Sequence, residues 1–355
     1  MTTREAAGMR LFNQQIARSS CTSATEVVAR LTAMQAQDHR GALWSIGLRF
    51  PGSSIADVER AIAAREIVRT WPMRRTLHFV TAADVRWMLK LLAPRMINAA
   101  AGRMRQLGLD EAVFARSAKA IEKAMRDGEP LTRDELYAVL ERAKIPAGSQ
   151  RGIHILSRLS QDGLLCFASH RGRQPAFALL DEWIPTSRTL ARDEALAELT
   201  LRYFRGHGPA TARDLAWWAG LTLGDARTGL AMVASELAEI RIGEATHFVA
   251  QDAGVAPRTK RNVQLLPGFD EYLLGYTDRR IALDPTHASA IVPGNNGMFM
   301  PTIVAGGRVV GTWRTMVTGK KTVVSPTPFL PLDERDARAL TLASKRYERF
   351  MQREA

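Results

Sequence analysis

The stretch Pro130-Leu131-Thr132-Arg133-Asp134-Glu135-Leu136 returns about 80 residues later as Pro209-Ala210-Thr211-Ala212-Arg213-Asp214-Leu215. In each copy the threonine can cap a helix, and the acidic residue three positions later, Glu135 or Asp214, lies in its first turn. Each copy is followed by a second amphipathic segment (153–161 and 225–238) and then by β-prone residues (164–180 and 240–249). Two helices followed by a hairpin is the order of a winged helix, so the repeat predicts two such units.

The N-terminal block has the same order of elements. Apolar residues at three- and four-residue spacing predict a helix over 23–37, with Ser23 or Thr25 as its cap. A second helix is expected over 54–66, and strands over 71–80. The chain therefore carries three predicted winged-helix units in tandem.

The pattern of residues changes in the last quarter of the chain from helix-forming to β-forming. From Asn262 onward, β-forming residues are broken by Pro, Gly and Asn, which predicts a β-barrel-like domain, and a terminal helix is expected over 333–351. A helix that begins at Asp84 is expected to end before Pro94. The predicted fold class is α+β, and the predicted organisation is a first unit over 1–110, a second over 111–190, a third over 191–260 and the β-domain over 261–355.

Composition narrows the function. The chain has 355 residues, 49 Lys and Arg against 36 Asp and Glu, a formal net charge of +13 and two cysteines. It contains no apolar run long enough for a transmembrane helix and no signal-peptide pattern, so a cytoplasmic protein without membrane contact is expected. Two cysteines are too few for a disulfide framework or a thiolate zinc site. Arginine supplies most of the excess charge, which favours nucleic-acid phosphates as partners unless a general coding bias has raised arginine everywhere.

Four stretches, in order along the chain, resemble the winged-helix family that includes the AlkZ-type and YcaQ-type DNA glycosylases. They are Met34-Gln35-Ala36-Gln37-Asp38, Trp71-Pro72-Met73-Arg74-Arg75-Thr76-Leu77-His78, Leu265-Leu266-Pro267-Gly268-Phe269-Asp270-Glu271-Tyr272-Leu273-Leu274-Gly275-Tyr276 and Gly307-Arg308-Val309-Val310-Gly311-Thr312-Trp313-Arg314. The resemblance implies three winged helices bent into a C shape around duplex DNA and braced by the β-barrel-like domain. It also implies excision of alkylated purines, including the unhooking of interstrand crosslinks.

The catalytic signature of that family is a glutamine, an apolar residue, and then a glutamine in AlkZ-like members or an aspartate in YcaQ-like members. Gln35-Ala36-Gln37 matches the AlkZ-like branch. An amide does not titrate and cannot act as a general base, but its carbonyl oxygen can accept a hydrogen bond from a water and fix that water near C1′ of the sugar. N7-alkylguanine already carries a positive charge and needs little help to leave, so two amides suit a cationic lesion.

Helix geometry raises an objection to this site. Residues two apart in a regular helix lie about 200° apart and do not share a face. Gln35 and Gln37 can converge on one water only if the predicted helix loosens or ends near them. The alternative is that Gln35 is a buried amide bonded to backbone and Gln37 a surface residue. Asp38 is a possible base by type, or a carboxylate in solvent.

Basic residues at predicted hairpin tips and on one predicted helix are candidates for DNA contacts. Arg74 and Arg75 fall at the tip of the first hairpin, where the alternative is a solvated or salt-bridged turn. The other candidates in the same class are His78, Arg151, Arg158, Arg171 and Arg173. No histidine pair has metal-ligand spacing, so no metal and no cofactor are expected. The acids of Asp270-Glu271-Tyr272 are interpreted as structural anchors.

Two functions therefore compete. The first is a monofunctional, water-using DNA glycosylase for N7-alkylguanine-type lesions. The sequence has no lysine near the motif, which argues against a lyase that forms a Schiff base. The second is a non-enzymatic winged-helix DNA-binding protein or regulator, which would bind intact DNA at paired half-sites. The first is favoured, and for it we expect a nucleoid-associated monomer with double-stranded DNA, damaged or crosslinked, as its partner.

Overall fold

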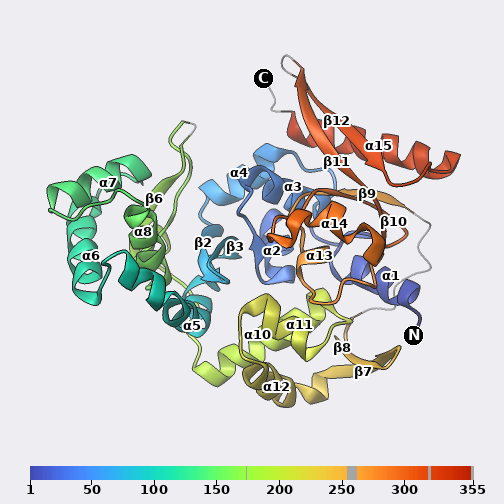
Figure 1. Cartoon of the computed structure of the whole chain (residues 1–355), viewed down its shortest axis with the longest axis horizontal. Helices are drawn as coiled ribbons and strands as arrows, with labels where there is room; N and C mark the ends of the chain where they lie inside the picture. The colour runs from blue at the N-terminus through green and yellow to red at the C-terminus, as the bar shows by residue number, and fades with distance from the viewer. Residues whose placement is uncertain (173, 254–261, 319–320, 353–355) are drawn as a thin grey trace. The chain divides into compact units, whose positions relative to one another are not determined.

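Two compact units make up the chain, residues 1–60 with 196–355 (unit 1) and residues 61–195 (unit 2). The computed structural model describes residues 1–172, 174–253, 262–318 and 321–352. Figure 1 shows the helices and strands in chain colours. The division follows spatial contacts, whereas the four segments expected from the sequence follow the repeat of elements along the chain and stay a prediction.

Unit 1 gathers both ends of the chain. Its N-terminal part comprises α1 (Thr3–Asn13), α2 (Ala24–Leu31), β1 (Met34–Gln35), α3 (His39–Arg49) and most of α4 (Ile55–Ala63). The chain returns within α10 (Arg192–His207) and continues through α11 (Ala212–Ala219), α12 (Leu223–Met232), β7 (Leu237–Ile242) and β8 (Ala245–Ala250). Along the chain, the short helices α13 (Glu271–Leu274) and α14 (Ala288–Ile291) come between the first and the second strand of the C-terminal sheet.

The C-terminal sheet is antiparallel, with its strands in the order β12-β11-β10-β9. Its strands are β9 (Val263–Leu266), β10 (Thr302–Ala305), β11 (Arg308–Thr318) and β12 (Lys321–Pro328), and α15 (Glu334–Met351) packs against β9 and β12. The predicted terminal helix is therefore confirmed, with Asp333 as its cap. Within the described residues no pairing joins β12 to β9, so the sheet is not seen to close into a full barrel.

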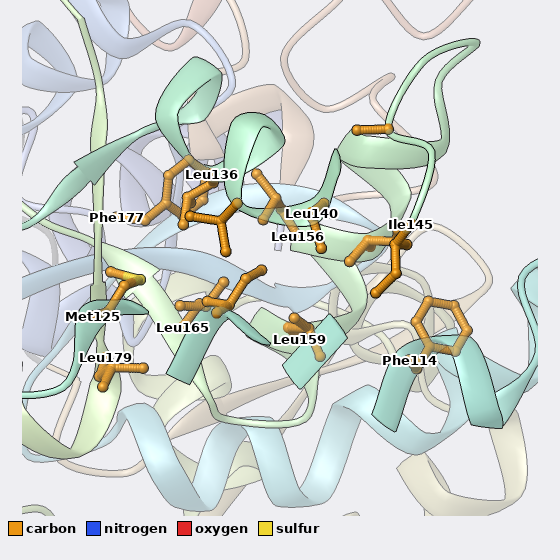
Figure 2. Packing of buried hydrophobic residues seen from close by; sticks show 14 of the residues in the cluster. Phe114, Met125, Leu136, Leu140, Ile145, Leu156, Leu159, Leu165, Phe177 and Leu179 are labelled. Atoms are coloured by element: carbon orange, nitrogen blue, oxygen red, sulfur yellow. The ribbon is translucent and has the colours of Figure 1, made fainter. Parts of the chain in front are cut away.

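Unit 2 is built on strands in the order β3-β2-β5-β6-β4, each antiparallel to its neighbour. The strands are β2 (Ile67–Met73), β3 (Thr76–Thr81), β4 (Leu131–Thr132), β5 (Leu165–Phe167) and β6 (Ala176–Leu179). The helices are α5 (Val85–Gln106), α6 (Glu111–Met125), α7 (Arg133–Arg142), α8 (Arg151–Gln161) and α9 (Leu180–Trp183). The apolar faces of α5 to α8 and of the strands meet in one buried cluster, most of it Leu, Ile, Met and Phe side chains, which Figure 2 shows from close by.

The order helix, strand, helix, helix, hairpin occurs along the chain as α2-β1-α3-α4-β2-β3 and as α6-β4-α7-α8-β5-β6. The series α10-α11-α12-β7-β8 repeats it, with an isolated bridge between Ala210 and Phe248 in place of the first strand. The predicted capping boxes of Thr132 with Glu135 and of Thr211 with Asp214 are both present. The mixed α and β architecture predicted from the sequence is confirmed.

One predicted helix end is wrong. Helix α5 continues through Pro94 to Gln106 instead of ending before the proline. Buried side chains precede Pro94, and beyond it Met104 and Leu107 pack against the core of unit 2. Burial on both sides of the proline outweighs the one backbone hydrogen bond that the proline removes.

Candidate active site

The glutamine motif lies in an extended segment of unit 1, because a strained turn ends the helix before it. Helix α2 stops at Leu31, and Thr32 has φ 70° and ψ −49°. The N–H of Ala33 donates to the Leu31 carbonyl at 2.8 Å, which closes a γ-turn centred on Thr32. Positive φ is unfavourable for a β-branched residue. The prediction of a helix as far as Gln37 is therefore wrong.

The geometric objection assumed a helix through the motif, and the motif is not helical. In extended backbone, side chains two residues apart lie on the same side, whereas in a helix they diverge. Gln35 ends strand β1 with 8% of its surface exposed, and Gln37 follows in a bend where it is exposed to solvent. The segment thus pairs a nearly buried amide with a solvent-facing amide at a spacing of two.

A buried carboxylate holds the backbone of the motif. The N–H of Gln35 donates to Oε1 of Glu271 at 3.0 Å. The other carboxylate oxygen, Oε2, accepts from the indole N–H of Trp218 at 2.7 Å and lies 3.3 Å from Nε2 of His207. Glu271 is only 1% exposed. Residues from β1, α10, α11 and α13 therefore meet at this carboxylate.

The neighbouring acid, Asp270, anchors the same loop to helix α3. Its two oxygens accept from the Arg49 guanidinium at 2.8 Å each, and Oδ2 also accepts from the Ser45 hydroxyl at 2.7 Å. The side chains of Arg49 and Asp270 are 0% and 3% exposed. Arg49 donates further to the carbonyl of Gln14 at 2.8 Å. The loop that carries Glu271 is thus fixed by a fully buried ion pair.

Asp38 follows the motif directly and begins helix α3. It is exposed, and its side chain makes no capping hydrogen bond. A Cβ added at Gly41 would lie 2.5 Å from Oδ2 of Asp38, so the glycine leaves room for this carboxylate over the first turn of the helix. The side chain stays next to the motif and open to solvent.

In unit 2 the predicted hairpin tip lies where the sequence places it. Arg74 and Arg75 connect β2 to β3, and their φ values of 52° and 57° match a type I′ hairpin turn. His78 is buried behind the turn. Its Nδ1 lies 2.9 Å from the Thr76 carbonyl, and its Nε2 lies 3.1 Å from Nη2 of Arg74. Because a guanidinium only donates, Nε2 is the acceptor and Nδ1 carries the proton.

The other basic candidates differ in what their side chains contact. Arg158 binds Glu111 at 2.7 Å and Asp162 at 2.9 Å, and Arg171 binds Glu135 at 2.7 Å. Arg151 donates to the carbonyl of Pro146 at 2.9 Å and to those of Leu107 and Gly108. These three guanidinium groups join elements of unit 2 to one another. Arg173 lies outside the described residues.

Comparison with known proteins decides the family. A family model described as DNA glycosylase AlkZ-like matches residues 28–350. The chain belongs to the AlkZ-like DNA glycosylases. It is 30% identical over 335 residues to an interstrand DNA cross-link repair glycosylase of Streptomyces sahachiroi, which covers 86% of this chain and 85% of that protein. It also resembles the solved structure of the Streptomyces sahachiroi DNA glycosylase AlkZ, with a TM-score of 0.82 and 25% identity over 99% of this chain and 96% of that one.

Membership of the AlkZ-like family makes the chain an enzyme that hydrolyses N-glycosyl bonds in DNA. The alternative of a recognition-only DNA binder is therefore set aside. Among the described residues, no three His, Cys, Asp or Glu side chains are grouped so that they could hold a metal ion. None of the described helices is long and apolar enough to span a bilayer.

One basic residue of this AlkZ-like chain, Arg103, is not among the candidates that the sequence indicates. Arg103 lies on the last turns of α5, and its Nη2 donates to Oε1 of Gln150 at 2.9 Å. Burial, followed by the charges of Arg103 and Arg75, lowers the pKa of His154 on α8. The charges of Arg75 and Arg103 therefore act on His154 in unit 2, and we call these three residues the basic cluster. Arg103 was missed because the helix was expected to end before Pro94.

Proposed function

We propose that the chain hydrolyses the N-glycosidic bond of N7-alkylguanine-type purines in DNA, with Gln35 and Gln37 positioning the attacking water. The observation that carries the proposal is that helix α2 ends at Leu31, before the motif, so the two amides are not held at the divergent spacing of a helix. Membership of the AlkZ-like family supports the reaction class, and the match of Gln35-Ala36-Gln37 to the catalytic signature supports the assignment of the two residues.

The chemistry fits an amide pair. N7-alkylguanine is cationic, so the electrons of the breaking C1′–N9 bond neutralise the base, which leaves without protonation. The sugar becomes oxocarbenium-like, and a water held by the two amide oxygens attacks C1′ and then releases one proton to solvent. Holding this water converts an encounter with bulk solvent into an attack within one complex, which is where the enzyme gains rate. An uncharged purine would need an acid that two amides do not supply.

We propose that DNA phosphates are bound by Arg74 and Arg75 at the β2–β3 turn and by Arg103 and His154 of the basic cluster. The three repeats of helix, helix and hairpin support winged-helix units, whose hairpins and second helices commonly meet DNA. His78 supports the turn from behind. Arg158 and Arg171 are left out of the proposed contacts because carboxylates of the protein neutralise them, and Arg151 is left out because three backbone carbonyls accept from it.

We further propose that the substrates include interstrand crosslinks. The relative of Streptomyces sahachiroi is named for cross-link repair, and the chain aligns with most of its length. A crosslinked guanine stays tethered to the opposite strand and cannot be flipped freely, so the exposed Gln37 suits a site that opens to solvent. We expect a monomer that acts on duplex DNA in the cytoplasm.

The experiment is base release from a duplex that carries a single N7-alkylguanine, free or within a nitrogen-mustard crosslink. Wild type is compared with Gln35→Ala and Gln37→Ala, and DNA affinity is measured for each protein. The proposal requires abasic sites with wild type and a loss of about 100-fold or more in single-turnover rate in the variants at unchanged affinity. Release by both variants at the wild-type rate would refute the assignment.

A further inference from the structure

Glu271 is a buried acid that the proposed reaction does not use. Its two carboxylate oxygens divide their contacts: Oε1 accepts from the Gln35 backbone N–H at 3.0 Å, and Oε2 accepts from Trp218 at 2.7 Å. We propose that Glu271 is a positioning residue, which fixes the backbone of Gln35 so that the amide pair meets its water. This inference rests on the proposed function of Gln35 and Gln37.

The chemistry of these two N–H donors requires a carboxylate. An ionised carboxylate only accepts hydrogen bonds, and here both of its oxygens face N–H donors. A glutamine at position 271 offers one accepting oxygen and one donating NH₂ group. Whichever way that amide turns, one donor, of Gln35 or of Trp218, faces another donor inside a buried space. The geometry therefore depends on the charge, and an isosteric amide cannot replace it.

The carboxylate is itself held rigidly. The Gly275 N–H donates to the Glu271 carbonyl at 2.9 Å, and a Cβ on Gly275 would lie 2.8 Å from both that carbonyl oxygen and Cδ2 of His207. The His207 ring stacks on Tyr203 with centroids 4.8 Å apart. The Tyr276 hydroxyl donates to the His207 carbonyl at 2.6 Å. Contacts with α10, α11 and α13 thus hold the acid in place independently of its hydrogen bond to the motif.

The anchor also explains how the strained turn persists. A non-glycine residue in a sparsely populated region costs about 1–3 kcal/mol and persists only where its surroundings determine it. Thr32 is buried, and Gln35, whose N–H donates to Glu271, follows it by three residues. The bond to Gln35 therefore holds the far side of the γ-turn and keeps the segment from continuing helix α2.

The test compares Glu271→Gln with Asp214→Asn in the full-length protein. Asp214 is a matched control, since it is a buried carboxylate of unit 1 that binds Thr211 and Thr277 but no residue of the motif. Two readouts are taken: single-turnover base release from N7-methylguanine DNA, and hydrogen exchange of the backbone amides in residues 33–37. Glu271→Gln should lower the rate by about 10- to 100-fold with DNA affinity nearly unchanged. Its Gln35 amide should also exchange at least about tenfold faster.

Glu271→Asp keeps the charge but is one methylene shorter, so it tests the proposal even if Glu271→Gln does not fold. It should retain the fold and lose both rate and protection at Gln35. Wild-type rate and protection in either folded variant, or equal losses in Asp214→Asn, would overturn the proposal. If wild type releases no base at all, the proposed function fails, while the exchange measurement still decides whether Glu271 fixes the motif.

Discussion

Removing Arg49 is expected to destabilise unit 1 strongly. Arg49→Met keeps much of the side-chain volume but deletes the guanidinium that binds both oxygens of Asp270 at 2.8 Å. The carboxylate of Asp270 then stays buried, and the donors left to it among the described residues are the Ser45 hydroxyl and the Tyr272 N–H. The carbonyl of Gln14 also loses its donor.

Breaking a buried ion pair from one side costs about 3–5 kcal/mol, because the remaining charge is left uncompensated. For a unit of this size each kcal/mol corresponds to about 2–4 °C in Tm, so Arg49→Met should lower Tm by roughly 6–20 °C. Thermal and urea unfolding of the full chain measure the loss. The control is Arg60→Met, which breaks an exposed pair with Asp57 whose side chains are 72% and 30% exposed. Its expected effect is below about 1 kcal/mol.

The double variant Arg49→Met/Asp270→Leu separates charge from packing. It removes both charges, so it should recover at least about 1 kcal/mol relative to the sum of the single losses. If Arg49→Met lowers the free energy of unfolding no more than Arg60→Met does, the ion pair of Arg49 and Asp270 does not anchor the loop. Strict additivity in the double variant would contradict the same reasoning.

Three further predictions concern other parts of the chain. Gly47→Ala should destabilise by about 1–3 kcal/mol, because a Cβ there would lie 2.1 Å from Cε2 of the buried Phe350 ring. Gly8→Ala, also inside a helix but with nothing within 4 Å of the new Cβ, should instead stabilise by about 0.5–1 kcal/mol, and calorimetry of both variants checks the opposite signs. Arg75→Ala should weaken binding to undamaged duplex and reduce the slope of log affinity against log salt by about one, whereas an unchanged slope would exclude a phosphate contact. Burial and the charges of Arg103 and Arg75 lower the pKa of His154 from its usual 6.5, and a bound phosphate should raise this pKa. DNA affinity should therefore increase as the pH falls from neutral into the acidic range where His154 becomes protonated. The pH dependence should be weaker in His154→Gln.

Much of the fold follows from local sequence signals. Threonine followed three residues later by an acid predicts both capping boxes, of Thr132 and of Thr211, since each residue pair satisfies backbone donors without distant partners. The tip at Arg74 and Arg75 was placed correctly because β-prone residues flank it. Helix α5 was cut short at Pro94, since its continuation depends on packing against residues that lie far along the chain.

The site was harder to predict than the fold. The apolar spacing of α2 continues as far as Met34 and gives no sign that Thr32 adopts positive φ. The carboxylate that accepts from the Gln35 N–H belongs to Glu271, which lies 236 residues away in sequence. The sequence predicts that the acids of the Asp270-Glu271-Tyr272 motif are anchors. Only the tertiary structure shows which partner each acid binds: Asp270 accepts from Arg49, and Glu271 accepts from the backbone of the glutamine motif.

The most direct test of the account compares two lesions in otherwise identical duplexes under single-turnover conditions. One duplex carries N7-methylguanine, which is cationic. The second duplex carries hypoxanthine, which is neutral at pH 7, at the same position. An amide pair that only positions water predicts rapid release of the methylated base and release of hypoxanthine at the spontaneous rate. Comparable enzymatic release of both bases would contradict the account, because a neutral purine leaves readily only when an acid protonates it.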